Sequence, residues 1–115
     1  MQTTNNTLIQ INGPGMGYGD QQLSLVLIEN YLKLILQEDQ LPKVITFYNE
    51  GVKLIVEGSP VINQLKEIET KGVKLLACKT CLNHFELIDK VEVGMAGSMI
   101  DIITLQNEAG KVITL

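Results

Sequence analysis

Short apolar runs alternate with helical patterns along this chain, and that alternation constrains the fold more than any other feature. Five runs rich in β-branched or apolar residues predict strands, at Thr7–Ile11, Lys43–Tyr48, Val73–Ala77, Val91–Val93 and Lys111–Leu115. The segments between them carry apolar residues at helical spacing. Strands that alternate with helices form parallel sheets, because each helix carries the chain back across a face of the sheet. The predicted fold is therefore α/β, a three-layer α/β/α sandwich with a mostly parallel five-stranded sheet, in a single domain of residues 1–115.

The helix predicted over residues 21–37, with Asp20 as its N-cap, has more apolar surface than one buried stripe requires. A second apolar row lies on another side of the same helix, so that the two rows are Leu23, Val26, Leu27, Tyr31 and Leu34, and Leu25, Ile28, Leu32 and Ile35. Either the helix is packed on several sides, or its outer row meets another subunit. We favour the second interpretation and expect a homo-oligomer.

Other residues at the ends of elements follow known capping preferences. Ser59 followed by Pro60 predicts the start of a second helix, which Gly72 ends. A short helix is expected over 82–89. The last helix is expected to open on a capping box and to bury one row of its side chains; the residues concerned are Ser98 and Asp101 for the box, and Met99, Ile102 and Ile103 for the row.

Composition excludes several classes of partner. The 115 residues carry a net charge of −4 and contain no run of Lys or Arg. Nucleic-acid binding and attraction to anionic membranes both need a basic patch, so neither partner is expected. The first residues, MQTTNNTLIQIN, lack the basic and apolar segments of a secretory signal. The longest apolar stretch is too short to span a bilayer, and a cytoplasmic protein is expected.

A glycine-rich loop, GPGMGYGD at residues 13–20, follows the first predicted strand. It does not match the dinucleotide-binding fingerprint because Tyr18 stands at the third glycine position, and it lacks the Lys-Ser/Thr pair of a phosphate-binding loop. The loop is either a flexible connector or a floor on which backbone N–H groups approach a small anion or a thiolate. Gly15 and Gly17, together with Lys79, are the candidate substrate-binding residues, and no cofactor is predicted.

The segment LLACKTCLNHF, residues 75–85, holds both cysteines of the chain and its one histidine. Zinc sites use four protein ligands, or three and an open position. Cys78, Cys81 and His84 could supply three, but the chain has no second Cys/His pair, so no metal site is predicted. Two buried cysteines that act as small hydrophobic residues remain an alternative. His84 is either solvated or close enough to influence a thiolate.

A reactive thiol is the third interpretation, and it depends on position. Cys78 is expected where a strand ends and a helix begins, next to the polar residues Lys79 and Thr80, which indicate partial exposure. Helix-terminal N–H groups and the Lys79 ammonium would lower the pKa of Cys78 and increase its thiolate fraction. Cys78 is therefore the predicted nucleophile. Cys81 is a second catalytic candidate, able to resolve Cys78 as a disulfide or to assist it.

Three segments resemble the DsrE/DsrF-like family, and within it most closely a YedF-like branch that is associated with selenium metabolism. They are GMGYGD at 15–20, NEGVKLIVEGSPV at 49–61 and KGVKLLACKTCLNHFELIDKVEVG at 71–94, and the resemblance extends over residues 8–115. It implies an α/β/α sandwich that forms homo-oligomers, often trimers or hexamers. Proteins of that branch usually carry an additional TusA-like domain, so the chain is expected to be either a stand-alone version or one excised domain.

The resemblance also implies a function. In sulfur-relay members, the cysteine that follows the third strand carries a persulfide, and Cys78 stands at that position, with Cys81 at the second cysteine of the branch. The partners would be sulfur donor and acceptor proteins, including a TusA-like protein. Lys79 and Glu86 depart from glycines that are common in the branch. A sulfur-relay, sulfurtransferase-like protein is the first hypothesis. The alternatives are a non-catalytic oligomeric module that binds a partner or ligand, and a dithiol redox protein.

Overall fold

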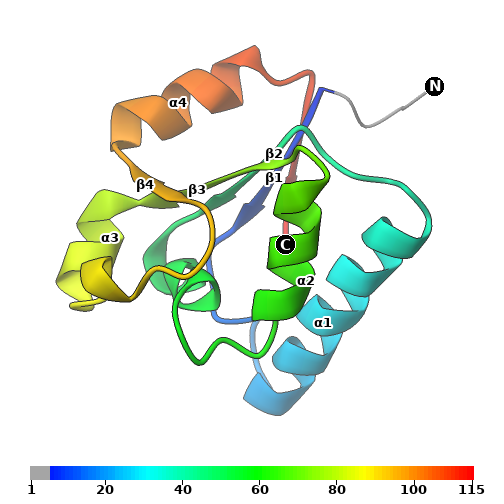
Figure 1. The fold of residues 1–115 in the computed structure, drawn as a ribbon, viewed down its shortest axis with the longest axis horizontal. Coiled ribbons are helices and arrows are strands. Elements are labelled where there is room, and N and C mark those ends of the chain that lie inside the picture. Colours follow the sequence, from blue (N-terminus) through cyan, green and yellow to red (C-terminus); the bar gives the residue numbers. More distant parts are fainter. Residues whose placement is uncertain (1–5) are drawn as a thin grey trace.

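The computed structural model describes residues 6–115 and confirms the α/β fold with a parallel five-stranded sheet (Figure 1). In chain order the elements are β1 (Thr7–Ile11), α1 (Gln21–Gln37), β2 (Val44–Phe47), the 3₁₀ helix η1 (Asn49–Ile55), α2 (Ile62–Thr70), β3 (Lys74–Cys78), α3 (Lys79–His84), the 3₁₀ turn η2 (Ile88–Lys90), β4 (Met95–Gly97), α4 (Met99–Glu108) and β5 (Lys111–Thr114). The strand order is β4-β3-β2-β1-β5, and all neighbouring strands in it pair in parallel.

The helices divide between the two faces of the sheet. α1 and α2 connect strands that advance in one direction across the sheet, whereas α4 leads from β4 at one edge to β5 at the other. Because crossovers between parallel strands are right-handed, this reversal places α4 on the opposite face, as Figure 1 shows. Within residues 6–115, no helix is long and apolar enough to cross a membrane.

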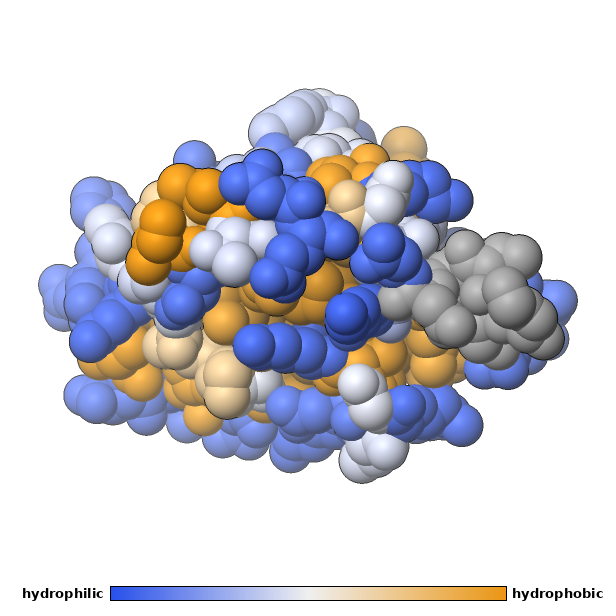
Figure 2. Space-filling view, turned by 90° about the horizontal axis from the view of Figure 1, so that it is seen from above, coloured by the Kyte–Doolittle hydropathy of each residue, from blue (hydrophilic) through white to orange (hydrophobic). Residues whose placement is uncertain are grey.

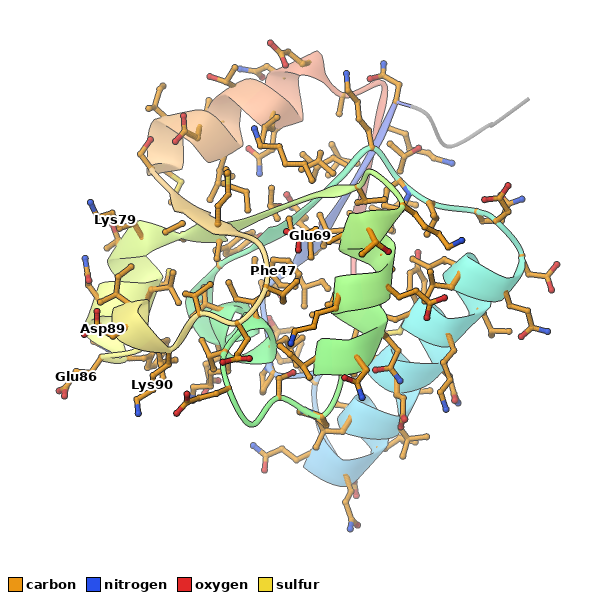
Figure 3. The ribbon with its side chains drawn as sticks, viewed as in Figure 1. Phe47, Glu69, Lys79, Glu86, Asp89 and Lys90 are labelled. Carbon is orange, nitrogen blue, oxygen red and sulfur yellow. The ribbon has the colours of Figure 1, made fainter. Side chains whose placement is uncertain are left out.

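The main core lies between the sheet and the pair α1 and α2. Ile9, Ile45 and Leu75 are aligned across β1, β2 and β3 and are all buried. Phe47, at the end of β2, is completely buried and lies in the middle of the molecule (Figure 3). Since side chains alternate along a strand, the neighbours of these residues along β1, β2 and β3 point to the opposite face of the sheet, toward α4.

The inner row of α1 supplies the helix side of this core. Ile28, Leu32 and Ile35 are buried, whereas Leu25 of the same predicted row is exposed and Ser24 is buried in its place. Asp20 is the N-cap, and its Oδ1 accepts a hydrogen bond of 2.9 Å from the N–H of Leu23. The other predicted row, which begins at Leu23, faces away from the core and is here called the outer row. It remains largely exposed, with Leu23, Val26 and Leu34 all more than half accessible.

The fourth strand lies four residues later than the sequence predicted. Residues 91–93 were expected to form it, but Val91 makes only an isolated bridge with Val56, and β4 is Met95–Gly97. Gly94 has a φ of 77° and donates its N–H to Oε2 of Glu69 at 3.0 Å, which turns the chain just before β4. Pairing with β3 therefore outweighs the β propensity of the Val91–Val93 segment.

Three helical predictions also differ from the structure. The short helix begins directly after Cys78, as α3, rather than at residue 82. α2 begins at Ile62, because Ser59 Oγ accepts the N–H of Val61 within a turn before the helix. The capping box of Ser98 and Asp101 is present, but of the row predicted to face inward on α4 only Ile102 is buried.

The side of the molecule that carries α4 is partly apolar at its surface. Met99 and Ile103, predicted to face inward, are 51% and 41% exposed, and Ile100 is exposed beside them. Figure 2 views this side and shows hydrophobic side chains in groups between polar ones. One helix alone therefore leaves this face of the sheet less completely covered than the face under α1 and α2.

η1 follows β2 directly, and Gly51 allows it to lie against β1. A Cβ at Gly51 would overlap the carbonyl oxygen of Ile11. We therefore expect Gly51→Ala to lower the free energy of unfolding by about 1–3 kcal/mol, because the backbone must move to admit the methyl group. Gly13→Ala is the matched control, since its Cβ would find its nearest neighbour at 3.9 Å. Equal urea midpoints for the two variants would contradict this packing.

Candidate functional site

The carboxyl ends of the parallel strands carry the unusual segments of the chain. β1 leads into the glycine-rich loop, β2 into Tyr48 and Asn49, β3 into α3, and β4 into Ser98 and Met99. In open α/β sheets, ligands bind at this edge. Two pockets lie there, one of about 420 Å³ beside the glycine-rich loop and one of about 350 Å³ beside Cys81. Asn49 lines both, so the pockets are neighbours.

The smaller pocket, here called the thiol pocket, takes its walls from three elements. Its lining residues are Tyr48, Asn49, Thr80, Cys81, His84, Phe85 and Met99. The aromatic rings and the methionine make the walls largely apolar, and none of the lining residues is acidic. A space of this composition suits a small, soft sulfur compound or a cysteine side chain from another protein.

Cys78 is not the accessible thiol that the sequence predicted. Its side chain belongs to the buried hydrophobic cluster and the residue is 1% exposed. It stands at the N-cap of α3, but its side chain makes no capping hydrogen bond there. α3 is only six residues long, so the helix dipole near Cys78 is weak. Partial exposure was inferred from the polar neighbours Lys79 and Thr80, which are exposed themselves while Cys78 points inward.

Cys81 is the cysteine that reaches the thiol pocket. It is half-buried, and its Sγ accepts a hydrogen bond of 3.1 Å from the backbone N–H of Asn49. Burial raises the pKa of Cys81, the neighbouring Cys78 thiol raises it further, and the Asn49 N–H lowers it only in part. The balance favours the protonated thiol at neutral pH, with one donor positioned to stabilise negative charge on the sulfur when it forms.

Asn49 holds its N–H toward this sulfur through an uncommon backbone conformation. Its φ is 52°, in the left-handed region that asparagine tolerates better than most residues. The segment is fixed on either side, because the N–H of Tyr48 donates to Ile11 and the N–H of Gly51 donates to Tyr48. Asn49 is therefore a residue that positions Cys81.

Asn49→Val should weaken both the fold and the thiolate. A β-branched residue in the left-handed region costs about 1–2 kcal/mol of stability. Backbone relaxation would move the N–H away from Sγ, which raises the pKa of Cys81 and slows its alkylation at neutral pH. The midpoint of the alkylation rate against pH should then shift upward. Asn49→Gly is the control, since glycine keeps both the conformation and the N–H, and a matching shift in that variant would contradict the role of Asn49.

The predicted substrate-binding residues fall in three different places. Gly17 is exposed and lines the larger pocket. Gly15 is buried and lines neither pocket; a Cβ there would lie 2.7 Å from the backbone of Ser24, so this glycine allows the loop to pack on α1. Lys79 lies at the outer end of α3 and points away from the molecule (Figure 3). The structure therefore does not bring these three residues together.

Several residues of the thiol pocket were not singled out from the sequence. Tyr48, Phe85 and Met99 carry no recognisable motif, and their one common signal is a position shortly after a strand or at the end of α3. Phe85 is held between two neighbours, with the Nζ of Lys53 4.7 Å from its ring centroid and the His84 ring in an edge-on contact. These contacts fix the part of the pocket wall that Phe85 forms.

A metal centre has no support in the part of the chain that the structure describes. Among residues 6–115, no three His, Cys, Asp or Glu side chains lie close enough together to hold a metal ion. The two cysteines and His84 therefore do not form the three-ligand set considered for zinc.

Comparison with known proteins identifies the family. The model of the DsrE/DsrF-like family matches residues 6–115. The chain belongs to that family. Among solved structures, the ychN protein from E. coli has a TM-score of 0.73 at 21% identity, with 96% of this chain and 99% of that chain covered. MTH1491 from Methanobacterium thermoautotrophicum has a TM-score of 0.71 at 17% identity, with the same shares covered. No curated protein gave a sequence match.

The two solved structures show a shared fold, whereas the family match shows the family to which the chain belongs. Both structures are less than 25% identical to this chain, so they show that the fold is shared. The match to the DsrE/DsrF-like family places the chain in a group that is associated with sulfur relay in general.

Proposed function

We propose that this DsrE/DsrF-like protein is a sulfur carrier that holds a sulfane sulfur as a persulfide on its Cys78–Cys81 pair. The observation that carries the proposal is the arrangement at the thiol pocket: an accessible sulfur with a backbone N–H aimed at it, beside a second thiol, at the edge of the sheet where ligands bind. The association of the family with sulfur relay agrees with it.

The transfer is an exchange at sulfur and needs no metal or cofactor. A cysteine thiolate attacks the outer sulfur of a donor persulfide; a new S–S bond forms, the donor S–S bond breaks, and the donor leaves as a thiolate. An acceptor thiolate then attacks the terminal sulfur in the same way and carries it off. Each step conserves electrons, so the protein returns to its dithiol state.

The raised pKa of Cys81 suits a carrier better than a fast enzyme. A protonated thiol reacts slowly with small electrophiles, and a thiol of high pKa is a poor leaving group. A persulfide on such a cysteine is therefore held long enough for a partner with a suitable thiol to bind at the pocket. The partners would be donor and acceptor proteins that present a cysteine, a TusA-like protein among them. The resemblance to the YedF-like branch would extend the cargo to selenium.

Sulfur transfer can be measured directly. The reduced protein is incubated with a small sulfane-sulfur donor, separated from it by gel filtration, and assayed for cyanide-labile sulfur before and after addition of an acceptor thiol. We expect about one labile sulfur per chain, lost on addition of the acceptor, and none in the Cys78→Ser/Cys81→Ser variant. Equal labile sulfur in the wild type and the double variant would exclude the cysteine pair as the carrier.

A second candidate function is favoured by a separate observation. The outer row of α1 exposes large apolar side chains, and those of Leu23, Val26 and Leu34 are more than half accessible. Such a row is suited to bury itself against another copy of the chain, in a homo-oligomer such as the trimer or hexamer implied by the family resemblance. An oligomeric module that binds a partner without chemistry would keep this assembly but show no labile sulfur in the assay above.

A further inference from the structure

We propose that Cys81 takes the sulfane sulfur and that Cys78 is the buried resolving thiol, the reverse of the order that the sequence suggested. The inference rests on the proposed function and assigns separate roles to its two cysteines. Three features of the site carry it: the access to each sulfur, the position of the one hydrogen-bond donor, and the spacing of the two residues.

Access separates the two cysteines most clearly. Transfer requires the donor sulfur to approach the attacking thiolate in line with the S–S bond that breaks, which needs open space at the attacking atom. Cys81 lines the thiol pocket of about 350 Å³, whereas Cys78 is 1% exposed and is enclosed by buried hydrophobic residues. A donor persulfide can therefore reach Cys81 while Cys78 stays covered.

The hydrogen-bond donor is also directed at Cys81. The Asn49 N–H lies 3.1 Å from its Sγ and stabilises negative charge there, which helps the attack by this sulfur and its return to a thiolate when an acceptor takes the terminal sulfur. Among the described residues, the structure gives Cys78 Sγ no corresponding backbone donor. The site therefore favours charge on the outer cysteine.

The spacing gives Cys78 a role in release. Cys78 is the N-cap of α3, Cys81 lies three residues on, and the two thiols lie within hydrogen-bonding reach of each other. Cys78, as its thiolate, can attack Sγ of the Cys81 persulfide from within the core. The Cys78–Cys81 disulfide forms, the bond between Sγ and the terminal sulfur breaks, and hydrosulfide leaves through the pocket. A dithiol reductant then supplies two electrons and two protons and restores both thiols.

Single variants separate the two roles. Wild type, Cys78→Ala and Cys81→Ser are treated with a sulfane-sulfur donor, capped with an alkylating agent and mapped by peptide mass. Alanine fits the buried site of Cys78, and circular dichroism checks that each variant is folded; Cys78→Val is a second variant if alanine is not tolerated. We expect the added sulfur on Cys81 in the wild type and in Cys78→Ala, and its loss in Cys81→Ser. Sulfur on Cys78 in the Cys81→Ser variant at the wild-type level would overturn the inference.

Release provides the second readout. Over a prolonged incubation without an acceptor, after the loaded state has been recorded, wild type should slowly liberate hydrosulfide and form the internal disulfide, whereas loaded Cys78→Ala should retain its sulfur and release at least tenfold less hydrosulfide. Equal release from the two proteins would overturn the resolving role of Cys78. A wild-type protein that takes up no sulfur at either cysteine would instead contradict the proposed function, so the two failures are distinguishable.

Discussion

Leu34→Glu should convert the homo-oligomer proposed for this chain into a monomer. Leu34 is 53% exposed on the outer row of α1, where Leu23 and Val26 are similarly open. If this row is the centre of a subunit interface, glutamate brings an unpaired charge into it, and an uncompensated buried charge costs about 3–5 kcal/mol. A loss of that size per interface lowers the association constant by more than a hundredfold.

Light scattering coupled to gel filtration measures the effect on the mass in solution. Gln22→Glu is the matched control, since it places the same charge at an exposed polar position near the start of α1. The control should keep the mass of the wild type. Leu34→Glu and the wild type eluting with the same mass would show that this row is not the interface.

Phe47→Ala should be among the most destabilising single substitutions in the chain. Phe47 is completely buried at the end of β2 and lies in the middle of the molecule (Figure 3). Truncation of a buried phenylalanine removes its transfer free energy and leaves a cavity, which together cost about 3–5 kcal/mol. A single domain commonly has only about 5–15 kcal/mol of stability, so the variant should be close to unfolded at moderate urea concentration.

Thr46→Val, on the opposite face of the same strand, is the control. The Oγ1 of Thr46 is buried and has no hydrogen-bond partner among the described residues. Its replacement by a methyl group should leave the stability unchanged or raise it by about 1–2 kcal/mol, because an unsatisfied buried hydroxyl is lost. Urea denaturation should therefore move the two midpoints in opposite directions or leave that of Thr46→Val unchanged. A large loss in Thr46→Val would mean that the hydroxyl has a partner.

Features that depend on neighbouring residues in the sequence were predicted well. β1 and α1 have the predicted bounds, because a β-branched run and an Asp N-cap act over a few residues. The capping box of Ser98 and Asp101 was found for the same reason. β4 was misplaced because its position depends on pairing with β3 and on the contact between Gly94 and Glu69, 25 residues apart.

In the candidate site, too, features set by neighbouring residues were predicted, and features set by distant contacts were not. The sequence identified the CxxC segment and the edge of the sheet at which it lies, since both follow from the order of strands and helices. It misjudged which cysteine is accessible, because exposure depends on how η1 and α3 pack together. The contact that distinguishes Cys81 comes from Asn49, 32 residues earlier, and a backbone N–H leaves no signal in a sequence.

The most direct test of the central claim is the intact mass of the reduced wild-type chain after treatment with a sulfane-sulfur donor and gel filtration without reductant. The cysteine pair at the thiol pocket predicts a gain of one sulfur atom, which a dithiol then removes. An unchanged mass, in a folded protein whose Cys78 and Cys81 are both shown to be reduced by alkylation after denaturation, would contradict the assignment of this chain as a sulfur carrier.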